Sequence, residues 1–140
     1  PQVKQKTPPV DASAFDVPMS PLLEKLQGEW LPTQLVQNGQ ALEQMLLGFG
    51  SRSFNRNETK VVFGGQVMLH AKMRVDEAHS PVRIDYLNLH RSSEGTISLG
   101  ILDWVGDEVR ICMSAAGKPR ASDFTSDAGS GRTLSSWKRK

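Results

Sequence analysis

The side chains of this sequence that could take part in chemistry are one cysteine, three histidines, carboxylates beside aromatic rings, and basic residues near the C-terminal end. Cys112 lies in the run RICMS, where it alternates with Ile111 and Met113. This alternation directs the thiol toward an outer face or under a loop. A nucleophilic thiol needs a neighbouring base and a lowered pKa. No base is identifiable in the sequence, so we predict a structural cysteine.

The three histidines are His70, His79 and His90. Metal-binding histidines in zinc sites recur at short, characteristic intervals, and none of these three has such spacing. His70 and His90 fall on two predicted strands that pair about a turn, and the pairing places them too far apart to share a metal ion. We therefore predict solvated histidines, no metal site and no cofactor.

Asp85-Tyr86 and Asp103-Trp104 each place a carboxylate beside an aromatic ring. Two carboxylates can perform acid–base catalysis when they lie about 5 to 10 Å apart across a site. Both aspartates are expected on outer strand faces, where carboxylates are usually solvated. We therefore predict no catalytic residues. A cyclase or isomerase that works by shape alone would leave no motif and is kept as an alternative.

The segment AAGKPRASDFTSDAGSG is long for a connection between two neighbouring strands, and such connections are usually functional or packed as a lid. We predict that Phe124 pins this loop over one end of the fold, so that the loop acts as a plug. The alternative is that the loop acts as a gate for a ligand. Lys118, Arg120 and Arg132 are expected to form one positive rim there, because Pro119 stiffens the turn between the first two. Such a rim suits a ligand with an apolar body and an acidic head, or an acidic patch on a partner.

The elements that must position these side chains are mostly strands. Apolar residues alternate with polar ones in short segments, which turn-forming residues such as Asn38-Gly39 separate. Strands are expected near residues 29–37, 50–55, 59–63, 66–75, 82–91, 95–104, 108–114 and 132–139. Hairpin connections predict an all-β fold, an eight-stranded antiparallel up-and-down barrel, because closure removes both sheet edges. A two-sheet sandwich is the alternative.

Two short helices and one flexible segment complete the prediction. Ser20 and Pro21 are typical of a helix start, which predicts a helix at 20–27, and a second is predicted at 41–48. Residues 1–19 are rich in proline and are predicted to be a flexible linker or tail. Residues 20–140 then form one domain. The side chains expected in the barrel interior are Trp30, Val67, Leu69, Met73, Ile84, Leu99, Ile101, Val109, Ile111 and Met113.

Both ends of the predicted barrel carry residues that suit its closure. Trp30 follows Gly28 at the start of the first strand, and Lys138 and Arg139 end the last strand. The first and last strands of an up-and-down barrel must pair, so one of these cations can lie across the indole, a contact of about 0.5 to 2 kcal/mol. Gly28, Trp30 and Arg139 resemble the lipocalin signature, which implies a structural role in closure.

A broader resemblance covers about residues 26 to 139. LQGEW, SPVRIDYLNL and the closing stretch GDEVRICMSAAGKPRASDFTSDAGSGRTL with its basic pair resemble a bacterial family of uncharacterised lipocalin-like domains, enriched in planctomycetes. The resemblance implies the barrel fold and attachment to other domains, and no established activity. Trp137 departs from the family pattern, where an aliphatic residue is more common. The matching positions are Gly106, Asp107, Cys112, Gly117, Lys118, Pro119, Arg120, Phe124, Gly129, Ser130 and Gly131.

Composition and charge limit the classes of partner. The chain has 140 residues, a formal net charge of +2 and 6% aromatic residues, which argues against a nucleic-acid surface. No segment is apolar enough for a membrane span, and one cysteine excludes an internal disulfide without fixing a compartment.

These limits favour a non-enzymatic binding module for a small apolar or acidic-headed ligand, in the barrel or at its mouth. The alternative is a filled barrel that recruits a protein partner for an attached domain, with residues 1–19 as tether.

Overall fold

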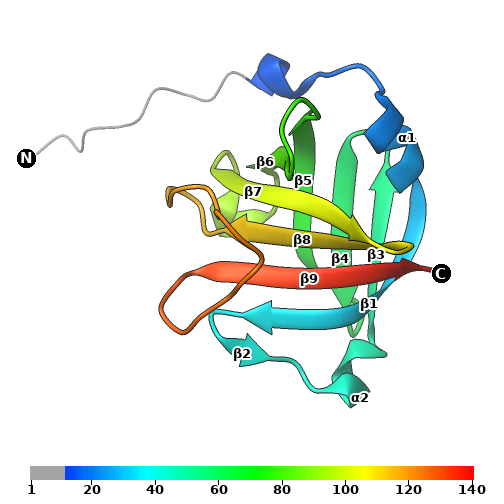
Figure 1. Ribbon diagram of the computed structural model, residues 1–140, viewed down its shortest axis with the longest axis vertical. Helices are drawn as coiled ribbons and strands as arrows, with labels where there is room; N and C mark the ends of the chain where they lie inside the picture. The colour runs from blue at the N-terminus through cyan, green and yellow to red at the C-terminus, as the bar shows by residue number, and fades with distance from the viewer. Residues whose placement is uncertain (1–11) are drawn as a thin grey trace, which may run out of the picture.

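The fold is a closed, eight-stranded antiparallel barrel, as the alternation in the sequence predicts (Figure 1). The computed structural model describes residues 12–140. A ninth, two-residue strand, β2, pairs antiparallel with the end of β1 and does not belong to the ring. The strands are β1 (Gly28–Gln37), β2 (Gln40–Ala41), β3 (Gly50–Asn55), β4 (Glu58–Phe63), β5 (Gln66–Asp76), β6 (Val82–Asn88), β7 (Ile97–Val105), β8 (Glu108–Ser114) and β9 (Arg132–Arg139).

Closure is made by the first and last strands of the ring. β1 pairs with β3 on one side and with β9 on the other, from Trp30 opposite Arg139 to Gln37 opposite Thr133. All other neighbours in the ring follow one another along the chain, which is the up-and-down topology. Because β1 completes the ring, the eight barrel strands have no free edge.

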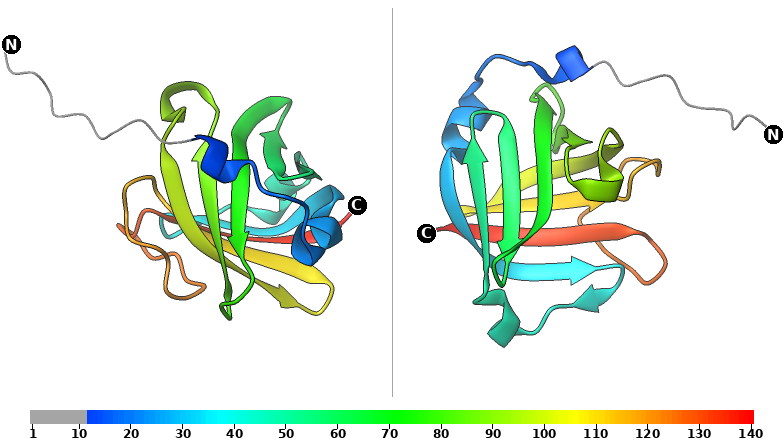
Figure 2. Two further views of the ribbon diagram at one scale, coloured as in Figure 1. Left: turned by 90° about the horizontal axis from the view of Figure 1, so that it is seen from above. Right: turned by 180° about the vertical axis from the view of Figure 1, so that it is seen from behind.

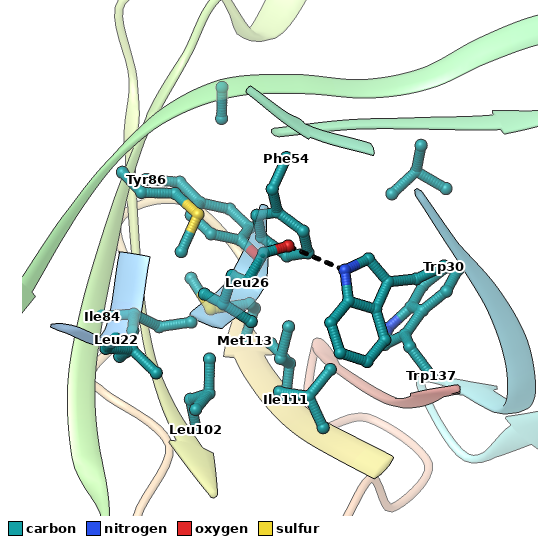
Figure 3. Close-up of a cluster of buried hydrophobic side chains, with 14 residues drawn as sticks. Leu22, Leu26, Trp30, Phe54, Ile84, Tyr86, Leu102, Ile111, Met113 and Trp137 are labelled. Atoms are coloured by element: carbon teal, nitrogen blue, oxygen red, sulfur yellow. Dashed lines mark hydrogen bonds between the residues drawn. The ribbon is translucent and has the colours of Figure 1, made fainter. Parts of the chain in front are cut away.

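Helix α1 (Pro21–Leu26) closes one end of the barrel. Ser20 caps it, as predicted, by accepting a hydrogen bond from the backbone N–H of Leu23 at 3.3 Å. Leu22 and Leu26 enter the core cluster together with residues from the strands (Figure 3). The indole N–H of Trp30 donates to the carbonyl of Leu26 at 2.8 Å, so the buried ring has no unsatisfied donor. The helix and Trp30 thus fill this end of the barrel.

Helix α2 (Gln44–Leu47) lies between β2 and β3, and Figure 1 shows it at the other end of the molecule from α1. It is shorter than the predicted helix at 41–48, because Ala41 instead pairs with Val36 in β1. In the part of the chain that the structure describes, no helix is long and apolar enough to cross a membrane.

Part of the segment predicted as a linker packs on the barrel. Residues 1–11 of the predicted linker 1–19 lie outside the described residues. The short 3-10 helix η1 (Ala12–Phe15) buries Phe15, which is 1% exposed. Asn57 donates to its carbonyl at 2.6 Å, and the guanidinium of Arg74 lies 4.4 Å from its ring centre.

Two residues predicted to face the interior, Leu99 and Ile101, lie on the outer face of β7. The inward positions of β7 alternate with them, since Leu102 belongs to the core cluster and Gly100 leaves room for Met113. A Cβ at position 100 would lie 2.2 Å from the Met113 sulfur. Alternation misassigned this strand because both of its faces are apolar and a glycine occupies an inward position.

The outer face is apolar here because a long segment covers it. We call residues 115–131, between β8 and β9, the strap. Ala121 and Phe124 of the strap pack on Ile101, Cys112 and other residues on the outer side of the sheet. Figure 2 shows this orange segment outside the ring of strands. The strap therefore covers the wall of the barrel, and its Phe124 does not plug an end.

Candidate ligand-binding cavity

The half of the barrel farthest from α1 contains a cavity of about 340 Å³. Its lining comes from the ends of strands at the opposite end of the barrel, such as Gln37 of β1 and Phe63 of β4. Of the predicted interior residues, Leu69, Ile111 and Met113 line the cavity, and Met73 lies in the core below it. Pockets of roughly 300 to 1,000 Å³ are the usual size for small-molecule sites. This cavity is therefore large enough for one compact ligand.

Arg52 is the most unusual side chain in the cavity wall. It lies on β3 between Gly50 and Phe54, and its alternation with them turns the guanidinium inward. The residue is only 3% exposed. Its Nε–H donates to the hydroxyl of Thr59 at 2.9 Å, and Nη2–H donates to the hydroxyl of Tyr86. These two bonds fix the plane of the guanidinium inside the barrel.

Three aromatic rings surround this cation. The Arg52 guanidinium carbon lies 4.8 Å from the ring centre of Phe54, 5.2 Å from that of Trp137 and 5.8 Å from that of Tyr86. The negative faces of aromatic rings attract a cation, more strongly where water is excluded. The ring of Trp137, close to the end of the last strand, thus helps to hold the charge.

Arg52 has no negative partner among residues 12–140. None of the ion pairs formed by these residues includes it. Arginine carries its charge at all physiological pH values, and buried charges are normally paired. Its Nη1 makes no hydrogen bond to the described residues. Every fully buried side-chain nitrogen or oxygen atom of these residues has a hydrogen-bond partner. Because Nη1 has none, it is not fully buried and must be accessible from the cavity that Arg52 lines. The cavity floor therefore presents unused donors and a positive charge.

The basic residues predicted to form a rim lie in or beside the strap, and none of them lines the cavity. Arg120 pairs with Asp85 at 2.7 Å and donates to two backbone carbonyls of β6 and β7. Arg132 pairs with Asp123 at 2.7 Å. Lys118 is exposed. Two of the three cations are thus already neutralised by aspartates. Their predicted role in binding a ligand or a partner stays a prediction.

Further contacts hold the strap to the wall. Hydrogen bonds from Thr125 and Arg132 hold the pKa of Asp123 below its usual value. The guanidinium of Arg110 lies 4.0 Å from the ring centre of Phe124. The side-chain hydrogen bond between Asp103 and Arg110, 2.7 Å at its shorter contact, raises the pKa of Arg110 above its usual value. Phe124 is therefore held between a charged side chain and the apolar outer wall.

The other candidates for chemistry have structural surroundings. Cys112 is buried under the strap, with its sulfur 3.4 Å from the carbonyl oxygen of Thr125, and burial raises the pKa of its thiol. His70 contacts Glu58 at 2.9 Å, and His79 contacts Asp76 at 3.3 Å. Over residues 12–140, no group of three or more potential ligands is placed to hold a metal ion.

The structure brings Gly28, Trp30 and Arg139 together. The Arg139 guanidinium lies 4.2 Å from the Trp30 ring centre and donates to the carbonyls of Gln27 and Lys25, at 2.8 and 2.6 Å. Gly28 has a φ of +112°, a conformation that favours glycine. A Cβ there would lie 3.4 Å from Arg139 Nη1. These contacts join the end of the last strand to the end of α1.

Sequence reasoning missed Arg52 and Tyr86 as site residues. A signal was present, because Arg52 shares the inward face of its short strand with Phe54 and with Gly50. An arginine at an inward position of a barrel strand indicates a buried charge. Its partner Tyr86 is 34 residues away, and only the folded chain shows that the two meet.

Comparisons of the chain with protein-family models, with curated proteins and with solved structures found no match. The candidate site therefore depends on the geometry alone.

Proposed function

We propose that this protein binds a small apolar molecule with an acidic head group, and that the head lies on the cavity floor at Arg52 and Tyr86. The observation that supports this most directly is the buried guanidinium of Arg52, which has no carboxylate partner among residues 12–140. The function is binding without catalysis.

The donors left free on the floor suit a carboxylate. Arginine has five N–H donors, and the described residues use one on Nε and one on Nη2. Both hydrogens of Nη1 are unused. The hydroxyl of Tyr86 accepts from Arg52, so its own hydrogen can be donated. One carboxylate oxygen can bind Nη1 of Arg52 and the other the hydroxyl of Tyr86, which would give the buried charge its missing partner.

The apolar part of the ligand is expected above the floor. Val61 and Leu69, on β4 and β5, line the cavity next to each other in register. Phe63 and Met68 continue this apolar surface toward the mouth. Burial of a hydrocarbon body against these side chains supplies about 25 cal/mol per Å² of apolar surface.

Displacement of a fluorescent anionic dye tests the proposal. Anilinonaphthalene sulfonate has an apolar ring system and an acidic group, so we expect saturable binding and competition by palmitate. Hexadecanol, which has a similar chain without the charge, should compete less well. Arg52→Met should weaken palmitate binding about ten- to hundred-fold, the loss of a charge-assisted hydrogen bond.

Arg132→Met is the matched control, because it removes an arginine that is paired with Asp123 outside the cavity. It should leave palmitate binding unchanged. Equal effects of the two substitutions, or no saturable binding of any acid, would contradict the proposal.

A protein-interaction function is the second candidate, favoured by apolar side chains exposed near the mouth. Met45 is 77% exposed and Phe49 is 65% exposed, in and beside α2. Phe49 lies beside the β4–β5 turn, since its carbonyl accepts from Gly64 N–H at 3.0 Å. Capture of a partner that is lost with Phe49→Ser, while acid binding is retained, would support recruitment as the function. If Phe49→Ser changed neither partner capture nor acid binding, ligand binding would remain the better supported function.

A further inference from the structure

We infer that the ligand is a compact, facially amphipathic acid, with hydroxyl groups along one side and a hydrocarbon surface along the other. The inference rests on the proposed function and names the class of molecule that the cavity fits. It follows from an asymmetry between the two sides of the cavity.

One side, formed by β4 and β5, is apolar throughout. Its lining residues are Val61, Phe63, Met68 and Leu69. None of these side chains has a hydrogen-bonding group other than the weak acceptor sulfur of Met68. A ligand surface that faces this side gains by carrying no polar atoms, because a buried polar atom without a partner costs free energy.

The other side carries polar groups on four strands. Asn88 of β6 donates through Nδ2 to the hydroxyls of Ser98 and Thr96, each at 3.1 Å. Thr133 of β9 lies opposite Gln37 of β1, and both line the cavity. These strands follow one another around the barrel from β6 to β1, with β8 between them. This side is mixed and not wholly polar: β8 contributes Ile111, Met113 and Ser114, and Leu35 and Trp137 also line it.

Several of these polar groups have unused hydrogen-bonding capacity. Ser98 accepts from Asn88 and is 9% exposed, so its own hydrogen is free for a group in the cavity. Ser135 accepts from the indole N–H of Trp137 at 2.8 Å and is 4% exposed, with its hydrogen likewise free. Thr133 makes no side-chain hydrogen bond to the described residues. Hydroxyl groups of a ligand would satisfy these donors and acceptors, whereas a plain alkyl chain would displace water from them without replacement.

The limited depth of the cavity also favours a short, broad molecule over a long chain. About 340 Å³ is near the lower end of the usual range for ligand pockets. The depth is limited because Arg52 and the core below it form the floor. A ring system with an acidic side chain places its charge on Arg52 and keeps its two faces near the two sides of the cavity.

Bile acids are suitable probes because they vary one face of a constant skeleton. Cholate carries three hydroxyl groups on one face, and lithocholate has the same skeleton and acid with a single hydroxyl. Lithocholate is more apolar and would bind more tightly to a purely apolar cavity. We expect the opposite order here, with cholate tighter than both lithocholate and palmitate by titration calorimetry.

The double variant Thr133→Val, Ser98→Ala tests whether these two residues bind the hydroxyl groups of the ligand. Each change removes a hydroxyl that faces the cavity and keeps an uncharged side chain of equal or smaller size. The pair should weaken cholate binding about tenfold, the effect of one or two neutral hydrogen bonds, and leave lithocholate binding unchanged or tighter. Ser136→Ala is the matched control, since Ser136 is the neighbour of Ser135 on the outward face of β9 and does not line the cavity.

The outcomes separate this inference from the proposed function. The inference would be supported if the parent protein prefers cholate, the double variant loses this preference and Ser136→Ala keeps it. Equal or tighter Arg52-dependent binding of palmitate or lithocholate would overturn it and leave the proposed function standing. If the double variant kept the preference for cholate, the claim that the polar side of the cavity binds the hydroxyl groups would be overturned. Binding of none of the three acids in an Arg52-dependent way would overturn both.

Discussion

Arg139, near the end of the chain, lies across the indole ring of Trp30 at the start of the barrel, with its guanidinium carbon 4.2 Å from the ring centre. The two residues are also partners in the register of β1 and β9. This pair is the first of the seven in the register that joins the first strand of the ring to the last.

Replacement of Trp30 with alanine should destabilise the protein by about 3 to 5 kcal/mol, the usual cost of removing a large aromatic ring from a core. Trp30 is 1% exposed and contacts the core below α1. Urea unfolding followed by circular dichroism measures the effect. Met45→Ala, at a side chain that is 77% exposed, is the control and should change the free energy of unfolding by less than about 0.5 kcal/mol. A similar loss in both variants would refute the role of Trp30 in closure.

Replacement of Arg139 with alanine should cost about 1 to 2 kcal/mol, since it removes a cation–π contact and two hydrogen bonds to the end of α1. Lysine at this position should restore only part of the loss, because it cannot reproduce the planar fork of donors. Thermal unfolding of the three proteins tests the order. Full recovery with lysine would show that charge alone matters.

Arg52→Met should leave the unliganded protein as stable as the parent or more stable. Removing a buried charge that has no ionic partner among residues 12–140 relieves its desolvation, which should offset the loss of the hydrogen bonds to Thr59 and Tyr86. The methionine side chain can pack among the rings. This outcome, together with the loss of acid binding, would show that Arg52 is kept for function at the expense of stability. A loss of more than about 2 kcal/mol would instead show that the guanidinium holds the barrel together.

Stability should fall at alkaline pH because of Cys112. Burial raises the pKa of this thiol in the folded protein above its value in the unfolded chain, about 8.5. The folded state therefore holds the proton more tightly, and the contribution to stability is fully present below pH 8.5 and is lost as the pH rises toward the folded pKa. Unfolding measured from pH 7 to 10 should show a decline that Cys112→Ala lacks. Parallel profiles for the two proteins would contradict it.

The strap should open locally when Arg120 is replaced. Arg120 binds Asp85 and two backbone carbonyls, while Cys112 lies beneath the strap beside Thr125. Arg120→Ala should therefore speed the reaction of Cys112 with a thiol reagent in the folded protein, about ten- to hundred-fold for a loss of 1.5 to 3 kcal/mol. Lys118→Ala, at an exposed cation in the same segment, should leave the rate unchanged. Equal rates in all three proteins would show that the strap is held by other contacts.

Most of the barrel could be predicted from the sequence, because its signals are local. Alternation and turn residues placed the strands, and Ser20 with Pro21 placed the start of α1. Alternation failed at Leu99 and Ile101, because both faces of β7 are apolar and the strap packs on the outer one at Ile101. No local pattern shows that a segment later in the chain will fold back onto a strand.

The candidate site was harder to predict because it depends on contacts between distant strands. The basic residues of the strap suggested an anion site, yet Asp85 and Asp123 neutralise two of them. The sequence does not distinguish Arg52 as a site residue, since a single arginine in a strand of six residues usually faces solvent. Its inward direction follows from Phe54 on the same face. That it has no carboxylate partner among residues 12–140 is seen only in the closed barrel.

The position of the strap also has a kinetic consequence. Ala121 and Phe124 of the strap lie on the outer wall and do not line the cavity, so under the proposed function a ligand would reach the floor without waiting for Phe124 to move. Release would likewise require only that the bonds to Arg52 and the cavity walls break. The time for which a ligand stays bound would then be set by its affinity, and occupancy would follow each change in its free concentration with little delay. A protein that binds in this way would equilibrate quickly with its ligand and would not trap it.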